Sequence, residues 1–240
     1  MIHTERRGHT LLITIDRPHR RNAVDHDTLT AMRTAIGGAG DARAVVLTGA
    51  GGHFCAGADL TGLEDTTFAS LLRDVLHGLR DLPRPTIAAV SGAALGAGTQ
   101  LAAACDLRVA TSDATFGIPA VRLGVAVDHW TIQRLAFDWG FGPARAMLIA
   151  GETFSGADAV RLGFVHRTGG LDDAMDWAAE LADRAPLTIA AHKLGLTRLE
   201  ADVTDDPDYQ AAFAQAWASA DLEEGMTAFR EKRPPRFEGR

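Results

Sequence analysis

The stretch Ser91-Gly-Ala-Ala-Leu-Gly-Ala-Gly-Thr-Gln100 decides the fold, because it joins two apolar runs of different character. Residues 86–90 predict a strand and residues 101–104 predict a helix, so the glycines between them mark a strand, turn and helix. The first amide groups of a helix have no intrahelical acceptor, and the helix dipole favours negative charge there. The turn is therefore a candidate binding place for an oxygen atom that carries or develops negative charge.

A second stretch of small residues, Phe54-Cys-Ala-Gly-Ala-Asp-Leu60, follows a predicted strand at 44–48 and the glycine run 49–52. Small residues let the backbone approach a ligand closely. Amide donors from two such loops could form an oxyanion hole, although tight turns alone also explain isolated glycine clusters. A dinucleotide-binding motif is disfavoured because its third glycine would fall on Leu101, and a P-loop is excluded because no Gly-Lys-Ser/Thr follows.

The rest of the chain predicts alternating strands and helices and then a mainly helical end. Residues 10–15 and 106–110 are strand-like, whereas residues 29–36 and 71–79 carry apolar side chains at helical spacing. Asp25 or Asp27 can cap the first of these helices, and Pro83 with Pro85 ends the second. From about residue 142 helix-forming residues dominate.

Composition narrows the class of protein. With 240 residues, 46% of them apolar, and a net charge of -7, the chain reads as a globular protein without the basic surface that nucleic-acid binding needs. No apolar run approaches the roughly 18 residues of a membrane span and no signal core follows the charged N-terminus, so we expect a cytoplasmic protein without a membrane span. Cys55 and Cys105 belong to no metal-ligating cluster, so no metal site is expected. A polyanionic ligand would depend on local cations, for which the candidates are Arg17, Arg20, Arg21, Lys232, Arg233 and Arg236.

Over essentially its whole length the chain resembles the enoyl-CoA hydratase/isomerase (crotonase) family. The resemblance rests on an ordered series of blocks: Arg17-Pro to Arg21-Asn-Ala-Val24, Val46-Leu-Thr-Gly, Phe54-Cys-Ala-Gly-Ala-Asp, Ile87-Ala-Ala-Val to Gly98, Cys105-Asp-Leu-Arg, Phe116-Gly-Ile-Pro119, Gln133-Arg-Leu, Gly151 to Val165, and Glu224-Gly-Met to Arg233. It implies an α/β fold, the crotonase (ClpP-like) spiral of ββα units. Residues 1–185 would form the spiral core with the acyl-CoA site, and residues 186–240 a helical oligomerisation region that builds a homotrimer or a dimer of trimers.

The same resemblance implies which residues bind a coenzyme A thioester, the expected substrate or ligand, with no prosthetic group. The amide groups of Ala58 and Ala97 would form the oxyanion hole. The second position is usually glycine in the family, and alanine keeps the donor if its backbone is right-handed. The adenine pocket would be lined by Ala56, Asp59 and Leu60, Arg21 would face the phosphates, and Phe229 and Lys232 would close over the nucleotide from the same or a neighbouring subunit. Phe229 is equally well explained as a core aromatic.

Hydratases of the family use two glutamates, and the matching positions here hold Gln100 and Ala120. Neither residue exchanges a proton near neutral pH, so efficient hydration of an enoyl thioester is not expected. Asp128 matches an aspartate of certain dienoyl-CoA isomerases and chlorobenzoyl-CoA dehalogenases and is a candidate base or nucleophile, although it also suits the N-cap of a helix starting near His129. We expect Trp130 to line the acyl tunnel, and His53 and His129 to be packing or surface residues.

Three hypotheses follow for function. The first is an acyl-CoA isomerase or related enzyme that uses Asp128. The second is a non-catalytic acyl-CoA binder, favoured by the likeness to actinobacterial homologues that lack both glutamates and combine Leu-Gly or Leu-Ala at the oxyanion turn with an Asp-x-Trp segment. An assembly protein without a ligand is the third and weakest. Any acyl-CoA activity would belong to fatty-acid or lipid metabolism.

Overall fold

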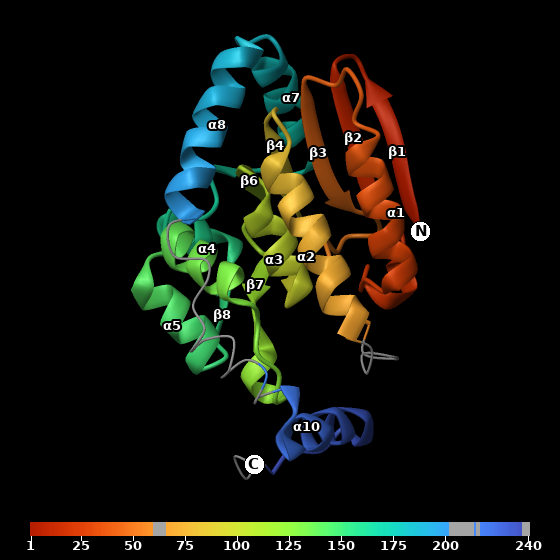
Figure 1. Cartoon of the computed structure of the whole chain (residues 1–240), viewed down its shortest axis with the longest axis vertical. Coiled ribbons are helices and arrows are strands. Elements are labelled where there is room, and N and C mark those ends of the chain that lie inside the picture. Colours follow the sequence, from red (N-terminus) through yellow and green to blue (C-terminus); the bar gives the residue numbers. More distant parts are fainter. Residues whose placement is uncertain (60–65, 202–213, 215–216, 237–240) are drawn as a thin grey trace.

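The structure is a computed structural model that describes residues 1–59, 66–201, 214 and 217–236. Its centre is a six-stranded sheet (Figure 1) in the order β1 (Ile2–Arg7), β2 (Thr10–Ile15), β3 (Ala44–Gly49), β4 (Thr86–Val90), β6 (Leu107–Ala110) and β9 (Arg167–Thr168). β1 and β2 are antiparallel, and every other neighbouring pair is parallel. Parallel strands need crossover connections, and helices make most of them here.

Side chains of the central strands alternate between two apolar cores, as strand geometry requires. In β2, Leu11, Ile13 and Ile15 face one core, whereas Leu12 faces the other. The first core also holds apolar side chains of α1 (His26–Gly37), α2 (Thr66–Asp81) and α3 (Ala97–Ala104), and the second holds those of α7 (Leu171–Ala182). The sheet is therefore covered by helices on both faces (Figure 1).

The structure also has a smaller, three-stranded sheet. Its order is β5 (Ala93–Leu95), β7 (Thr115–Gly117) and β8 (Thr153–Ser155), with the first pair parallel and the second antiparallel. Further helices are the short η1 (Pro18–Arg20), η2 (Pro119–Arg122) and α6 (Gly156–Arg161), and the longer α4 (His129–Trp139) and α5 (Phe141–Ile149). The rings of Phe116, Trp139 and Phe164 pack together, with Trp139 stacked on Phe164 at 4.3 Å between centroids.

The helix α8 (Pro186–Ala201) is anchored to the core by one buried cation. Lys193 is 8% exposed, and its Nζ atom lies 2.6 Å from Oδ2 of Asp106, while also donating to the carbonyl oxygens of Leu79 and Arg84. Asp106 in turn accepts hydrogen bonds from the amide and hydroxyl groups of Thr86. A buried charge needs such full pairing, so Lys193 fixes where α8 lies.

The last described helix, α10 (Ala220–Glu231), docks on the turn that follows η2 and lies at the bottom of Figure 1. The backbones touch: a Cβ on Gly225 would lie 2.2 Å from the carbonyl oxygen of Leu123, and one on Gly124 would lie 2.4 Å from that of Asp221. Glu224 binds Arg233 through both oxygens, at 2.6 and 2.8 Å. That pairing and an amide donated by Arg236 lower the pKa of Glu224 to about 2.

The strands and helices expected from the sequence are present, and Asp25 caps α1 by accepting from the Thr28 amide. The end of the chain is mainly helical as expected, with β8 and β9 as short interruptions. β1 was not expected, because only Ile2 in it is even half-buried and an edge strand of polar residues carries no apolar alternation. Within the described ranges no helix is both long and apolar enough to cross a membrane.

Candidate active site

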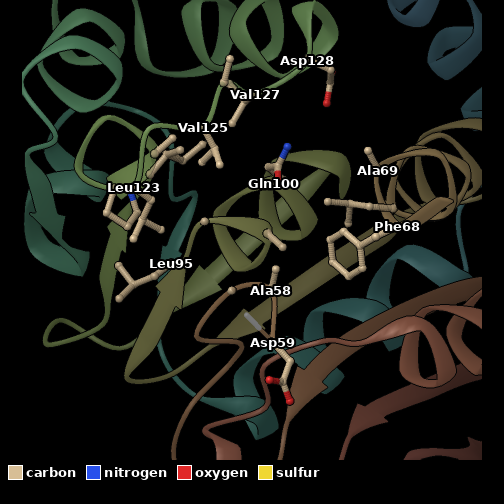
Figure 2. Close-up of a pocket in the computed structure, with 18 of the residues that line it drawn as sticks. Ala58, Asp59, Phe68, Ala69, Leu95, Gln100, Leu123, Val125, Val127 and Asp128 are labelled. Atoms are coloured by element: carbon tan, nitrogen blue, oxygen red, sulfur yellow. The ribbon is translucent and has the colours of Figure 1, made fainter. Parts of the chain in front are cut away.

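A cavity of about 700 Å³ lies between α2, the turn before α3, the segment after η2 and α10. Figure 2 shows its apolar walls, with Leu95, Leu123, Val125 and Val127 on one side and Phe68 and Ala69 of α2 on the other. A mainly apolar pocket of this size with few polar groups is typical of a small-molecule site. The polar or charged lining residues in the described part of the chain are Arg20, Asp59, Ser70, Arg73, Gln100, Asp128 and His129. Trp217 also lines the cavity, and its indole NH donates to the Ala126 carbonyl oxygen at 3.1 Å.

The two glycine-containing loops meet at the floor of this cavity. Cys55 donates its amide to Ala93 and accepts from that of Leu95, each at 2.9 Å. A Cβ on Gly98 would lie 2.0 Å from the Cys55 carbonyl oxygen, so residue 98 has no room for a side chain. Gly96 has φ 51°, a left-handed conformation that favours glycine. The close approach brings residues 57–58 and 96–97 side by side.

Ala58 and Ala97 each present a backbone amide to this place. Within the described ranges, neither amide donates a hydrogen bond. Ala97 is the first residue of α3 and has no positive φ, so it meets the condition of a right-handed backbone at this position. Both residues line the cavity. Two residues from neighbouring loops, with no hydrogen bond from either amide among the described residues, therefore line one cavity.

Asn22 and Arg17 hold the outer loop in position. Asn22 is fully buried with φ 59°, and its side chain donates to the carbonyl oxygens of Ala50 and His53 at 2.7 and 2.6 Å. Arg17 contacts Asp25 at 2.8 Å and Asp59 at 3.2 Å. Arg17 and Asn22, which belong to the first block of the family resemblance, therefore have a structural role. They hold the loop after β3 and the segment that carries Ala58.

His53 also has a structural role. Its Nδ1 atom accepts a hydrogen bond from the Ala93 amide at 3.1 Å, and the ring fills the space that a side chain on residue 92 would need. It is not among the residues that line the cavity. The expectation that His53 is a packing residue is confirmed.

Gln100 and Ala120, at the two positions where the family resemblance implies glutamates, both line the cavity. Gln100 is 6% exposed, and its Nε2 atom donates to the Thr131 hydroxyl at 2.8 Å. Asp128 also lines the cavity and is the N-cap of α4, accepting from the amide of Thr131 at 2.8 Å and from its hydroxyl at 3.0 Å. The capping interpretation of Asp128 is confirmed, and the cap leaves its carboxyl group facing the cavity (Figure 2).

The structure brings most of the expected site residues together. Those that line the cavity are Ala56, Ala58, Asp59, Ala97, Gln100, Ala120, Asp128 and Phe229. Arg21 and Lys232 are not among the lining residues, and Leu60 lies outside the described residues. Trp130 is not brought to the cavity either: its ring packs edge-on to His77 at 5.3 Å, with the Arg80 guanidinium 5.9 Å from its centroid. Burial there lowers the pKa of His77.

Other lining residues were not expected from the sequence as site residues. Arg20 replaces its neighbour Arg21 at the cavity, and α2 adds Phe68, Leu72 and Arg73. Met226 and Phe229 of α10 also line the cavity. Their spacing of three residues on a helix was a usable signal, because such residues share a face.

The cysteines add no reactive or metal-binding group to the site. Burial raises the pKa of the Cys55 thiol and of the Cys105 thiol to about 12, so both are protonated near neutral pH. In the described part of the chain no cluster of three or more His, Cys, Asp or Glu residues could hold a metal ion. The chemistry of the cavity therefore depends on backbone amides and on its polar side chains, among them Gln100 and Asp128. His129, which was expected to be a packing or surface residue, also lines the cavity.

Comparison with known proteins shows which family this chain is similar to. The sequence model of the family described as enoyl-CoA hydratase/isomerase matches residues 5–240. A protein of Mycobacterium bovis described as "Probable enoyl-CoA hydratase echA6" is 44% identical over 235 residues, which cover 95% of this chain and 96% of that protein. Carnitinyl-CoA hydratase from Mycobacterium avium is 34% identical with a TM-score of 0.86, and a methylmalonyl-CoA decarboxylase is 25% identical with a TM-score of 0.91; each match covers 100% of this chain and 98% of the other. The similarities confirm the α/β fold expected from the sequence.

Proposed function

The chain belongs to the enoyl-CoA hydratase/isomerase family, and from that premise we propose that its cavity binds an acyl-coenzyme A thioester through the amide groups of Ala58 and Ala97. The observation that carries the proposal is that both amides lack an acceptor among the described residues and line one apolar cavity. A thioester carbonyl oxygen would accept from both, and negative charge on that oxygen would strengthen the bonds. The names of the hydratases to which the chain is similar support a CoA thioester as the ligand.

The nucleotide and phosphates would lie at the mouth of the cavity, along the segment that carries Ala56 and Asp59. Arg20 lines this region and Arg21 follows it, and guanidinium groups suit phosphate oxygens. Asp59 does not repel the phosphates as a free charge would, because its carboxylate is paired with Arg17. Phe229 and Lys232 at the end of α10 would cover the nucleotide from the same chain.

The acyl chain would run between α2 and the segment after η2, where it meets few groups able to move a proton. Gln100 and Ala120 replace the expected glutamates, and the loss of a general acid or base costs roughly a hundred- to ten-thousandfold in rate. Of the two carboxylates that line the cavity in the described ranges, Asp59 is paired with Arg17 and Asp128 accepts two bonds from Thr131. His129 is a further lining residue, but the family resemblance implies no proton transfer by it. We therefore expect binding without efficient hydration.

A second form of the proposal is an enzyme, such as an isomerase, in which Asp128 moves a proton to or from the bound acyl group. It is favoured by one observation, that the Asp128 side chain lines the cavity (Figure 2). On this form Asp128→Asn abolishes turnover of an acyl-CoA while saturated acyl-CoA still binds, because asparagine keeps the N-cap but carries no charge. Tight binding without turnover of any acyl-CoA by the wild-type protein favours the non-catalytic form instead.

The test of the oxyanion hole compares an acyl-CoA thioester with the S-alkyl-CoA thioether of equal chain length, which lacks the carbonyl oxygen. Ala97 begins α3, a position where proline fits a helix, so Ala97→Pro removes the amide hydrogen there. Calorimetry should show that the wild-type protein prefers the thioester by about two- to tenfold and that Ala97→Pro loses the preference. Ala97→Ser keeps the amide and should keep the preference. A wild-type protein that binds both ligands equally, or neither, contradicts the proposal.

A further inference from the structure

One face of α2 brings a positive charge to the wall of the cavity. Arg73 lines the cavity together with Ala69, four residues before it, and Ser70, three residues before it. Side chains three or four residues apart are neighbours on the surface of a helix. The guanidinium group of Arg73 and the hydroxyl group of Ser70 are therefore adjacent on the wall that α2 contributes.

The next turn of α2 shows which end of the cavity Arg73 occupies. His77 follows Arg73 by four residues and packs edge-on against Trp130, with 5.3 Å between the ring centroids. Trp130 is in the first turn of α4, two residues after Asp128. Burial lowers the pKa of His77, the charge of Arg73 lowers it further and the charge of Asp128 raises it, so both charges act on this ring. Figure 2 shows Asp128 and Ala58 on opposite sides of the cavity, so Arg73 lies toward the end away from the proposed carbonyl site.

Arg73 has no polar partner in the described part of the chain, where it forms neither an ion pair nor a hydrogen bond. The two acidic residues of α2 are already paired, Asp74 with Arg33 of α1 and Asp81 with Arg80. A guanidinium group stays charged at neutral pH and presents its donors in a planar fork. The fork of Arg73 is therefore available to a ligand in the cavity.

The carboxylates that line the cavity do not occupy this fork. Of the two in the described ranges, Asp59 is paired with Arg17 and Asp128 caps α4. Arg20 is the other lining arginine in these ranges, and it lies in the part proposed for the phosphates. A ligand that carries negative charge at both of its ends would match the two arginines.

We propose that Arg73, with the hydroxyl group of Ser70 beside it, binds a carboxylate at the end of the acyl group away from the thioester, so that the cavity selects CoA thioesters of dicarboxylic acids. The inference rests on the proposed binding of acyl-CoA. A carboxylate offers two oxygen atoms to the guanidinium fork, and the Ser70 hydroxyl donates a further hydrogen bond. Both side chains are exposed, so solvent screens the pairing and the gain in affinity is modest.

The test compares two CoA thioesters by calorimetry, an ω-carboxyacyl-CoA and the ω-carboxamide of equal chain length, which differ only in the charge at the end of the chain. The pair is measured over a series of chain lengths. At the best length and low ionic strength the wild-type protein should favour the carboxylate by about three- to fivefold. Added salt should reduce this ratio of affinities. Arg73→Gln should bring the ratio to about one, and Arg73→Lys should keep part of it, since lysine keeps the charge but not the fork.

Arg33→Gln is the matched control. It removes an arginine that contacts α2 from α1 without lining the cavity, so it should keep the ratio. A ratio near one at every chain length in the wild-type protein overturns the inference while leaving acyl-CoA binding intact. If Arg73→Gln weakens both ligands equally and the ratio persists, the guanidinium group binds the phosphates of coenzyme A and the inference is wrong. Binding of neither thioester contradicts the proposed function itself.

Discussion

Gly98 lies against Cys55 so closely that a Cβ atom on residue 98 would come within 2.0 Å of the Cys55 carbonyl oxygen. The same Cβ would also lie 2.9 Å from the Cys55 carbonyl carbon, so the obstacle is rigid backbone and not the end of a flexible side chain. This contact sets the distance between the two loops that carry Ala58 and Ala97. The spacing of the two amide donors therefore depends on a residue that binds nothing.

Gly98→Ala should consequently impair both the fold and the site. The added methyl group forces the loops apart, and overpacking of this kind costs about 1–3 kcal/mol in the free energy of unfolding. Urea unfolding would measure that cost, and calorimetry would show weaker acyl-CoA binding in the protein that remains folded. Gly142→Ala is the matched control, because a Cβ there meets no atom within 4 Å, and its stability should be unchanged or higher. A fully stable Gly98→Ala variant contradicts the close approach.

Phe229 should contribute to ligand affinity from α10. Its ring lines the cavity yet is 56% exposed, so a ligand that covers it buries apolar surface. Phe229→Ala should weaken acyl-CoA binding by about tenfold, the equivalent of about 1.4 kcal/mol. Phe137→Ala removes an equally large ring that is 65% exposed and does not line the cavity, and it should leave the affinity unchanged. Equal affinities of the two variants would contradict the placement of α10 over the ligand.

The stability of the protein should fall as His166 becomes protonated. Partial burial and the charge of Arg108 lower the pKa of His166 to about 4 from 6.5, and its Nδ1 atom accepts from the Arg108 amide at 3.2 Å. Between these two pKa values the unfolded chain binds more protons than the folded chain, so the free energy of unfolding decreases as pH falls from about 6.5 to about 4. Because the ring is partly exposed to solvent, we expect a loss of about 1 kcal/mol from this group.

Urea unfolding of the wild-type protein and His166→Gln across that pH range isolates the contribution, because all other titrating groups are common to both. Glutamine can still accept from the amide but does not titrate. The stability advantage of the wild-type protein over His166→Gln should shrink as the pH falls. A difference that is independent of pH contradicts the assignment.

Association of several chains is expected to involve α8. Leu187 and Leu194 are 84% and 54% exposed, and a separation of seven residues puts them on one face of the helix, away from the buried Lys193. If residues 186–240 form an oligomerisation region as expected from the sequence, Leu194→Glu should shift a trimer toward monomer in sedimentation experiments. His192→Glu adds a charge on the opposite face of α8 and should leave the mass unchanged. A wild-type monomer at micromolar concentration would contradict this expectation.

Strands, helix caps and glycine turns could be predicted from the sequence, because each depends on residues that are close together in the chain. Residues 10–15, 44–48 and 86–90 read as strands because their buried side chains are apolar on both faces of the sheet, and Asp128 read as an N-cap because capping involves the next three residues. The glycine turns were also recognisable. Their function as a pair became predictable only through the family resemblance, since nothing local to residue 58 indicates that residue 97 lies beside it.

The rotation of α4 about its own axis could not be predicted from the sequence, and it decides which of its side chains reach the site. Trp130 and Thr131 are adjacent in α4, but Thr131 contacts Gln100, whereas Trp130 is turned toward His77 and Arg80 of α2. A rotation of about 100° per residue separates neighbouring side chains, so the expectation for Trp130 depended on an angle that packing alone decides. The ion pair of Lys193 and Asp106 could not be predicted either, because the two residues are 87 positions apart in the sequence.

The walls of the cavity come from Arg20 near one end of the described chain and from Phe229 near the other. Chains are synthesised from the N-terminus, and the early strands can begin to pack before the last helix exists. The amide donors of Ala58 and Ala97 would then be in place while one wall is still missing. A ligand in the cavity would lack the contacts of Met226 and Phe229 until α10 had been made and had docked. A ligand present at that moment would favour the docked helix by mass action and so act as a check on completed folding.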